Sequence, residues 1–272
     1  MTNTIITSGT FDNLCSNQVR FLHEIAKLGQ VHLLLLSDEF VEAVGSGKPK
    51  FPLPERHYYL RAFRYVSRVH IITDPAQLQN IPGIIGEKAD LWCILPSEES
   101  PKCRQYAESG GIGYKIVPDE QLGGFPENDI SHEPTSGKRV IVTGCFDWLH
   151  SGHIRFLEKA SEYGDLYVAV GNDENIKKLK GPGHPMFSQD ERRYMVAAVR
   201  FVKETLISSG HGWLDAEPEI RRIKPDIYIV NEDGDKEVKR KYCETFGIEY
   251  VVLKRLPKNG LPTRISTNLR GF

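Results

Sequence analysis

Two histidines three residues apart form the pattern in this chain that is best suited to chemistry. His150 and His153 stand at the predicted start of a helix near Ser151, directly after a predicted buried strand at Val140–Thr143. Residues three apart lie on one face of a helix, and the first helical turn presents free N–H groups and the positive end of the dipole. Both imidazoles can therefore point at one anionic ligand, and the stretch predicts a phosphate site.

Glycines on either side of the histidines fit such a site. Gly152 leaves no side chain in the path of an approaching phosphate, and Gly144 lets the strand end without a Cβ where a nucleotide must come close. Phe146 and Leu149 have the simpler alternative of packing under the first helical turn. The complete spacing, G-x-F-D-x-x-H-x-G-H, is much more specific than a lone glycine loop.

The stretch Val140–Leu157 resembles the signature of the cytidylyltransferase-like nucleotidyltransferases, which join a nucleotide to a phosphorylated small molecule and release pyrophosphate. The resemblance implies that His150 and His153 are catalytic. It implies nucleotide-binding roles for Gly144, Cys145, Phe146, Asp147 and Gly152. The reaction needs positioning and positive charge rather than a protein nucleophile, so Cys145 is interpreted as a packing residue.

Cationic residues downstream extend the resemblance. In the family, a lysine of the segment that includes Lys177 and Lys180 reaches the substrate phosphates, which makes Lys180 the first candidate and Lys177 the second. The alternative is a solvated helix face. The stretch Gln189–Val196 is similar to the family's E-R-x-x-x-V helix, whose arginine contacts substrate phosphate, and Arg192 occupies that position. Because Arg56 occupies the matching position in the first half of the chain, a structural Arg–Glu pairing is an equal alternative.

The family's last motif, R-T-x-G-I-S-T-T, is matched only in part. Ile265, Ser266 and Thr267 fit, which implies nucleotide binding, but Arg264 replaces the glycine. Either Arg264 or Arg255 must then stand in for the missing arginine. Ser266 and Thr267 have the alternative role of helix N-caps.

Magnesium is implied by triphosphate chemistry rather than by a visible cluster of protein ligands. Asp147 follows the family pattern and has two alternative roles: it holds Mg²⁺ through water, or it caps the turn. No other metal ligand is predicted.

The chain repeats itself with a shift of 135 to 136 residues. Gly9, Phe11 and Asp12 match the glycine, phenylalanine and aspartate of the later motif, but Cys15 and Gln18 stand where it has the two histidines. A thiol and a carboxamide cannot supply a cationic donor, so we predict that the first copy is catalytically silent. The alternative is a copy that binds a nucleotide without turning it over, or one that uses different chemistry.

Apolar runs alternate with helical patterns in both halves, which predicts an α/β fold of two tandem Rossmann-like domains, each with a parallel sheet flanked by helices. We expect a degenerate domain at residues 1–120, a linker at 121–138 and an active domain at 139–272, packed as an intrachain pseudo-dimer that can oligomerise further. The expected strands are Thr4–Ser8, Val31–Ser37, Val69–Thr73, Leu91–Leu95, Val140–Thr143, Leu166–Gly171, Thr205–Ser208 and Ile227–Val230. The expected helices include Pro54–Val66, Arg104–Ser109, Ser188–Val202 and Lys236–Phe246.

Composition limits the partners. The 272 residues hold 35 Lys plus Arg against 36 Asp plus Glu, so no overall field favours nucleic acid or an anionic membrane. Five cysteines without C-x-x-C pairs suit a reducing compartment, and no segment approaches a membrane span. The sequence therefore predicts a cytoplasmic protein.

The substrates expected are CTP or ATP and a phosphorylated or phosphonate small molecule. The tandem arrangement resembles the ethanolamine-phosphate cytidylyltransferases and favours CTP. The segment Leu179–Pro182 followed by Pro185 resembles the heptose-phosphate adenylyltransferases, which makes ATP the alternative. A non-catalytic nucleotide sensor is the alternative from another class, and pyrophosphate release would exclude it.

Overall fold

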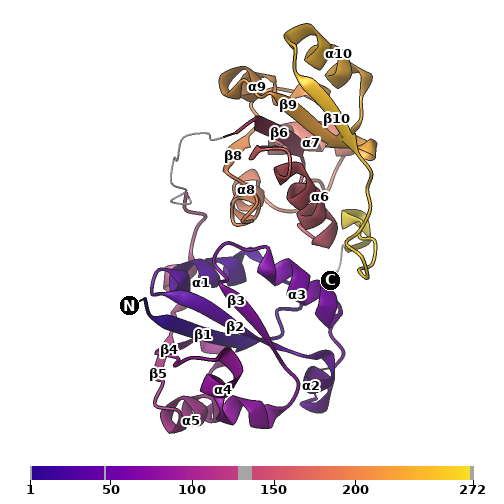
Figure 1. Cartoon of the computed structure of the whole chain (residues 1–272). Helices are drawn as coiled ribbons and strands as arrows, with labels where there is room; N and C mark the ends of the chain where they lie inside the picture. Colours follow the sequence, from indigo (N-terminus) through magenta and orange to yellow (C-terminus); the bar gives the residue numbers. More distant parts are fainter. Residues whose placement is uncertain (1, 46, 128–136, 270–272) are drawn as a thin grey trace. The chain divides into compact units, whose positions relative to one another are not determined.

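The computed structural model describes residues 2–45, 47–127 and 137–269, apart from the side chains of residues 267 and 268 (Figure 1). The chain divides into two compact units, Met1–Gly124 and Phe125–Phe272. Each unit contains one parallel sheet with helices on both faces. The expected α/β, Rossmann-like class is therefore confirmed.

In the described residues of the first unit, five parallel strands form a sheet in the order β3-β2-β1-β4-β5. The strands are β1 (Thr4–Gly9), β2 (Gln30–Leu36), β3 (Arg68–Ile72), β4 (Leu91–Ile94) and β5 (Gly113–Ile116). The α-helices are α1 (Ser16–Ala26), α2 (Asp38–Ala43), α3 (Leu53–Arg61), α4 (Ile81–Ile85) and α5 (Pro101–Ser109). Figure 1 shows α1 and α3 on one side of this sheet and α4 and α5 on the other.

The second unit has the same strand order when its described strands are read from the matching edge, β8-β7-β6-β9-β10. They are β6 (Arg139–Gly144), β7 (Asp165–Val170), β8 (Glu204–Ile207), β9 (Ile227–Asn231) and β10 (Glu249–Leu253). The α-helices are α6 (Ser151–Ser161), α7 (Asp173–Lys180), α8 (Gln189–Ala197), α9 (Glu217–Ile223) and α10 (Glu237–Phe246). Strands β6 and β9 are neighbours without being consecutive, so the chain reverses direction across the sheet at β6. In such sheets, ligands bind at the carboxyl ends of the strands beside this point.

The central strands form because they are nearly continuous apolar runs that are covered on both faces. Val140, Ile141 and Val142 of β6 are fully buried, as are Ile5 and Ile6 of β1. One core cluster of the second unit joins the sheet to α9 and α10 and includes Ile141, Tyr167, Ala169, Ile220, Tyr228, Tyr242 and Cys243. The sheet is therefore a rigid base for the loops at its carboxyl edge.

Short one-turn helices connect several of these elements in the described residues. They are η1 (Pro75–Gln79), η2 (Pro96–Glu98), η3 (Asp119–Leu122), η4 (Gly212–Leu214), η5 (Glu232–Gly234) and η6 (Ser266–Leu269). Of these, η4, η5 and η6 lie in the second unit and follow β8, β9 and β10.

The helices α3 and α8 end earlier than the sequence pattern predicts. The residues that follow continue as turns with three-residue hydrogen bonds, such as Val66 N–H to the Phe63 carbonyl and Val202 N–H to the Val199 carbonyl. All four of these side chains are buried. The apolar pattern therefore continues past each helix end because turns, as well as helices, deliver side chains to the core.

The first residues of the segment expected as a linker are packed rather than extended into solvent. Leu122 is buried in the first unit, where the Gln121 carbonyl accepts a hydrogen bond from Arg20 at 3.0 Å. Phe125 contacts the ring of Tyr194 in the second unit, at 5.9 Å between centroids. Along the chain, the boundary between the two compact units therefore falls between residues 124 and 125, and residues 128–136 lie outside the described part.

Candidate active site

The turn after β6 brings the first predicted site residues together. Phe146 has a left-handed backbone with φ of 51°, and its ring is buried beneath the turn. A Cβ on Gly144 would lie 2.8 Å from that ring, so only glycine fits there. Phe11 repeats this conformation in the first unit, with φ of 47°. The glycine and the phenylalanine therefore shape the turn itself.

His150 is the N-cap of α6 and is only 3% exposed. Its Nδ1 accepts a hydrogen bond from the Gly152 backbone N–H at 3.1 Å. A Cβ on Gly152 would lie 2.9 Å from the His150 ring, so this glycine gives room to the histidine as well as to a ligand. The Nε2 atom is buried and has no hydrogen-bond partner in the described part of the chain. A neutral ring whose Nδ1 accepts carries its proton on Nε2, which leaves a donor for a ligand.

His153 stacks on His150 with 4.0 Å between ring centroids, as predicted by their spacing. Its Nδ1 is also buried and unpaired among the described residues. Burial lowers the pKa of His150 to about 3, with help from Arg255 and Arg264. Burial, then His150, Arg255 and Lys180, hold the pKa of His153 well below its usual value. The sequence pattern predicts cationic donors at these two positions. The structure makes them neutral at neutral pH in the absence of an anion.

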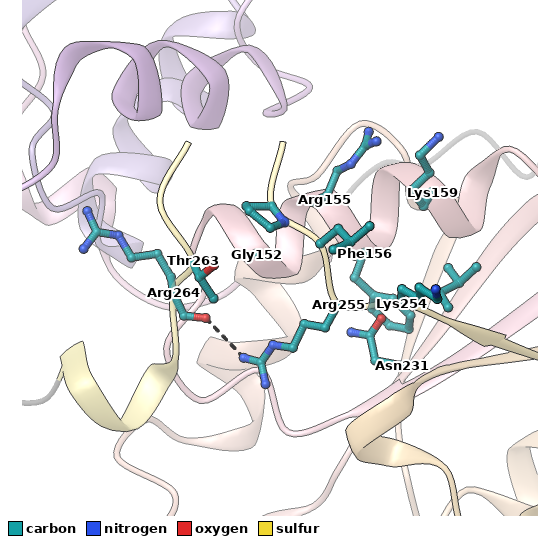
Figure 2. Close-up of a pocket in the computed structure, with 12 residues that line it drawn as sticks. Gly152, Arg155, Phe156, Lys159, Asn231, Lys254, Arg255, Thr263 and Arg264 are labelled. Carbon is teal, nitrogen blue, oxygen red and sulfur yellow. Dashed lines mark hydrogen bonds between the residues drawn. The ribbon is translucent and has the colours of Figure 1, made fainter. Parts of the chain in front are cut away.

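The cationic side chains that act on the histidines are Lys180, Arg255 and Arg264, whose charges help to lower the two pKa values. Lys180 lies at the end of α7 and hydrogen-bonds the Cys145 thiol, whose pKa is raised by burial. The Arg255 guanidinium donates to the Arg264 carbonyl at 3.2 Å (Figure 2). Lys177, the second lysine candidate, is exposed and does not line the cavity described below.

A cavity of about 400 Å³ opens over the carboxyl edge of the sheet. Its lining includes most of the predicted residues: Gly144, Cys145, Phe146, Asp147, His150, Gly152, His153, Lys180, Ile265 and Ser266. Arg255 lines it as well, whereas Arg264 lines only a smaller adjoining pocket of about 150 Å³, shown in Figure 2. Ser266 begins the short helix η6, and the side chain of Thr267 lies outside the described residues.

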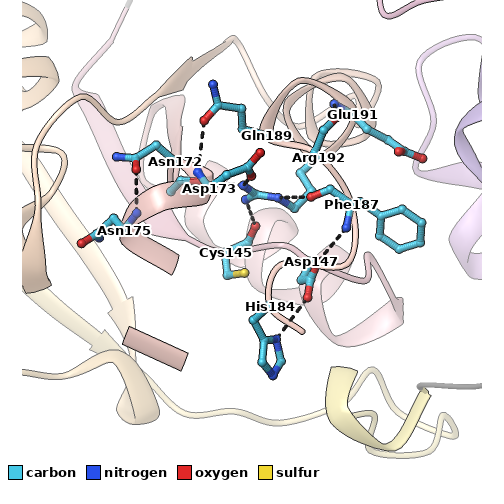
Figure 3. A network of polar contacts seen from close by, with 12 residues as sticks. Cys145, Asp147, Asn172, Asp173, Asn175, His184, Phe187, Gln189, Glu191 and Arg192 are labelled. Atoms are coloured by element: carbon cyan, nitrogen blue, oxygen red, sulfur yellow. Dashed lines mark hydrogen bonds and ion pairs between the residues drawn. The ribbon is translucent and has the colours of Figure 1, made fainter. Parts of the chain in front are cut away.

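Arg192 does not line either pocket. It is 1% exposed, and its guanidinium donates to the carbonyls of Phe187, Cys145 and Gly171, at 3.0, 2.5 and 2.7 Å. Asp173 completes the set at 2.7 Å (Figure 3). Arg56 makes the corresponding bonds in the first unit, to Phe51, Thr10, Leu36 and Asp38. The structure therefore gives Arg192 a positioning role. A structural Arg–Glu pairing is the alternative to phosphate contact that the sequence leaves open. Arg192 does form a structural ion pair, but its partner is Asp173 and not a glutamate.

Asp147 also acts within the fold. Its Oδ1 accepts from the backbone N–H groups of Met186 and Phe187, at 2.6 and 3.2 Å, and its Oδ2 lies 3.4 Å from His184 (Figure 3). Asp12 does the same for Lys50 and Phe51 in the first unit. Of the two alternatives for Asp147, the structure shows the turn-holding one. Within the described residues, no group of three or more His, Cys, Asp or Glu side chains could hold a metal ion.

One side of the cavity is formed by residues that the sequence pattern does not predict. Trp213, Asp215 and Lys239 line it, together with the buried Asn175, which holds the Gly212 backbone through two hydrogen bonds of 2.7 and 3.0 Å. No motif marks these residues. The available signal was Lys239, which precedes the apolar Tyr242 and Cys243 by three and four residues and therefore lies on the buried face of its helix.

Residues 141–265 match the family model described as cytidylyltransferase-like. The FAD synthase of Pyrococcus horikoshii is 39% identical over 124 residues, which cover 44% of this chain and 80% of that protein. The bifunctional protein HldE of Alcanivorax borkumensis is 32% identical over 192 residues, or 66% of this chain. The chain spans only 37% of that relative, and 28% of the HldE of Pseudomonas syringae pv. tomato. A lipopolysaccharide core biosynthesis protein from Thermoplasma volcanium aligns with 45% of this chain and 98% of its own, at 23% identity and a TM-score of 0.38.

The fold, the site and the curated relatives place the second unit in the nucleotidyltransferase class. The chain belongs to the cytidylyltransferase-like family, as its sequence signature indicated. In the part of the chain that the structure describes, no helix combines the length and apolar character that a membrane crossing requires.

Proposed function

We propose that the second unit transfers a nucleoside monophosphate from a nucleoside triphosphate to a phosphorylated or phosphonate small molecule, with release of pyrophosphate. The observation that carries this proposal is the pair of buried, unpaired ring nitrogens of His150 and His153 within one cavity. An unpaired buried polar atom is costly, and a ligand that hydrogen-bonds to it offsets that cost. Lys180 and Arg255 beside them supply the positive charge that a triphosphate needs.

The reaction is an in-line displacement. An oxygen of the acceptor phosphate bonds to the α-phosphorus, and the bond from that phosphorus to the bridging oxygen of the β-phosphate breaks, so pyrophosphate leaves with the electron pair. The His150 Nε2–H and the N–H groups of the first turn of α6 stabilise charge on the phosphates. Cys145 has no covalent role, because its thiol stays protonated and the step needs no protein nucleophile.

The two pockets support an assignment of the two substrates. Arg255 and Arg264 flank the smaller pocket, and one of them stands in for the arginine that meets the triphosphate in the resembled family. We place the nucleoside there, against the backbone of Leu253 to Pro257. The acceptor then occupies the far end of the larger cavity, towards Trp213.

We propose ATP as the donor nucleotide, with CTP as the alternative. The FAD synthase relative supports ATP, because FAD is a flavin mononucleotide joined to AMP, and that relative is matched over most of its length. The tandem arrangement, by resemblance, supports CTP.

We propose that Mg²⁺ enters with the triphosphate. Magnesium usually keeps several waters and is held by one or two carboxylates plus substrate phosphates. Both Asp147 oxygens already have partners, so the described residues do not form a built metal site.

A pyrophosphate-release screen tests the proposal. ATP, CTP, GTP and UTP are each combined with glycerol 3-phosphate, sugar phosphates, phosphoethanolamine and flavin mononucleotide, with and without Mg²⁺. At least one pair should release pyrophosphate in amounts matching the new diphosphate product. If the protein binds a nucleotide but no pair reacts, the non-catalytic sensor becomes the better explanation.

A further inference from the structure

Lys239 is a buried lysine in the cavity wall that the reaction as described does not use. It is the third residue of α10 and is 6% exposed. Its Nζ lies 3.3 Å from Thr143 Oγ1 and 5.5 Å from the centre of the Tyr228 ring. Burial lowers its pKa. A lysine so placed is costly for the fold unless something bound in the cavity satisfies it.

Most of the hydrogen-bonding capacity of Lys239 is unused. An ammonium has three N–H donors, and Thr143 takes one at most. No carboxylate of the described residues lies within ion-pair distance of it. Asp215 attracts its charge, but Asp215 Oδ2 accepts from Ser208 at 2.7 Å, and Asp233 pairs with Arg255 at 2.9 Å. The remaining donors of Lys239 therefore suit a ligand in the cavity.

The groups around Lys239 limit the chemistry of that ligand. Asp215 is a hydrogen-bond acceptor on the same wall, and the Trp213 ring is 52% exposed beside them. Lys236 lies 4.8 Å from the centre of the Trp213 ring, which adds a second positive charge at this end. A donor beside an acceptor suits hydroxyl groups, which both donate and accept, and an aromatic face suits the C–H surface of a polyol or sugar. Two lysines disfavour a cationic group.

We propose that Lys239 determines acceptor specificity: it binds hydroxyl groups at the end of the acceptor remote from its phosphate, which makes the acceptor a phosphorylated polyol or sugar and disfavours phosphocholine and phosphoethanolamine. This inference rests on the proposed function. The first unit supports it, because the corresponding third residue of α5 is Cys103. The lysine thus occurs in the unit that carries the histidines and is absent from the matching position of the other unit.

The test compares Lys239→Met with Lys241→Met. Methionine keeps the length of the side chain and removes its donors. Lys241 lies on the same helix, is 71% exposed and pairs with Glu237, so it is the matched control. With glycerol 3-phosphate, ribose 5-phosphate or mannose 1-phosphate as acceptor, Lys239→Met should lower kcat/KM about 10- to 100-fold, the effect of losing a hydrogen bond to a charged group.

Three further readouts separate recognition from a structural role. In Lys239→Met, the KM for the nucleotide should not change. The ratio of kcat/KM for these acceptors to kcat/KM for phosphocholine should become smaller. The melting temperature should stay the same or rise, because a buried charge is removed. The inference is overturned if wild-type protein prefers phosphocholine or phosphoethanolamine. It is also overturned if Lys239→Met alters only the nucleotide KM, or lowers the melting temperature while leaving acceptor kinetics unchanged.

A binding measurement keeps the inference separate from the proposed function. The thermal shift caused by the same polyol and sugar phosphates should exceed that caused by phosphocholine, and Lys239→Met should abolish the difference. Equal shifts in wild-type protein would overturn the inference. Absence of pyrophosphate release with every acceptor would instead count against the proposed function.

Discussion

His150 has two physical tasks at one position. Its Nδ1 caps α6 by accepting from Gly152, and this fixes the ring so that Nε2 remains available in the cavity. Its partner His153 adds a second buried ring nitrogen 4.0 Å away, measured between ring centroids. The histidines are therefore arranged for an anion before one arrives, and such preorganised donors are what lowers the barrier to phosphoryl chemistry.

Loss of either histidine should remove turnover without unfolding the protein. His150→Asn keeps an oxygen that can cap α6, whereas His153→Ala simply removes a ring. We expect each to lower kcat about 10²- to 10³-fold, because His150→Asn removes the Nε2–H donor to charge that grows in the transition state and His153→Ala removes the ring that stacks on His150. His211→Ala, an exposed histidine that caps η4 without a side-chain bond, is the control. Steady-state rates near those of wild type in both variants would refute the assignment.

The buried state of His150 should also make the fold sensitive to acid. Its pKa is about 3 in the folded protein against 6.5 as the ordinary value, so the unfolded chain binds the extra proton between these limits. Keeping His150 neutral therefore does not reduce the free energy of unfolding above about pH 6.5. The free energy of unfolding then falls as the pH drops from 6.5 towards 3, because the unfolded chain takes up a proton that the folded protein does not. His150→Asn should lose less in melting temperature than wild type between pH 7 and 5. An identical decline in both proteins would show that His150 does not carry this effect.

At the scale of elements, one buried arginine joins the loops that build the site. Arg192 on α8 connects the turn after β6, the end of β7, the start of α7 and the loop before α8. Only a forked guanidinium can make these contacts, because its N–H donors point in different directions and reach carbonyls on separate segments. The arrangement recurs around Arg56, so it belongs to the fold rather than to the reaction.

Arg192→Lys should therefore act through stability. Lysine keeps the charge but cannot reach the separate acceptors, and leaving buried carbonyls unpaired costs roughly 1–3 kcal/mol each. We expect a clear fall in melting temperature, with kcat lowered through misplacement of Cys145 and Lys180. Arg56→Lys is the matched control and should destabilise the first unit without altering KM. A stable Arg192→Lys protein with only a raised substrate KM would restore the phosphate-contact role.

At the scale of the whole molecule, the two units have one strand order but unequal chemistry. In the first unit, Cys15 is the N-cap of α1, and the Gln18 side chain accepts from its backbone N–H at 3.3 Å. Cys15 and Gln18 thus bond to each other at the start of α1, at the positions that His150 and His153 occupy at the start of α6. We therefore predict that Cys15→Ala and Gln18→Ala leave kcat nearly unchanged. A large loss of kcat at constant melting temperature would show that the first unit takes part in turnover.

The first unit, which we predict to be silent, still needs a purpose in the molecule. If the units pack as a pseudo-dimer, the first supplies an interface for the second, since fusion places both at high effective concentration. A fragment beginning at Gly137 should then be unstable, self-associating or poorly active by melting, light scattering and pyrophosphate release. A monomeric, stable and fully active fragment would argue for a regulatory purpose instead.

The sequence by itself determined the parts of this protein that depend on local pattern. Apolar runs of strand length and helical periodicity are encoded by neighbours in the chain, so β6 and the start of α6 at Ser151 were predicted to within a residue or two. The spacing of His150 and His153 likewise fixed their shared face.

Tertiary structure decided everything that depends on which distant segments meet. Whether Arg192 faces substrate or carbonyls follows from the meeting of four loops, and a motif position cannot specify it. The neutral state of the histidines arises from burial, which is a property of the assembled cavity. Lys239 is nearly 100 residues from Thr143 in sequence, so only the adjacency of β6, β9 and α10 makes it part of the site.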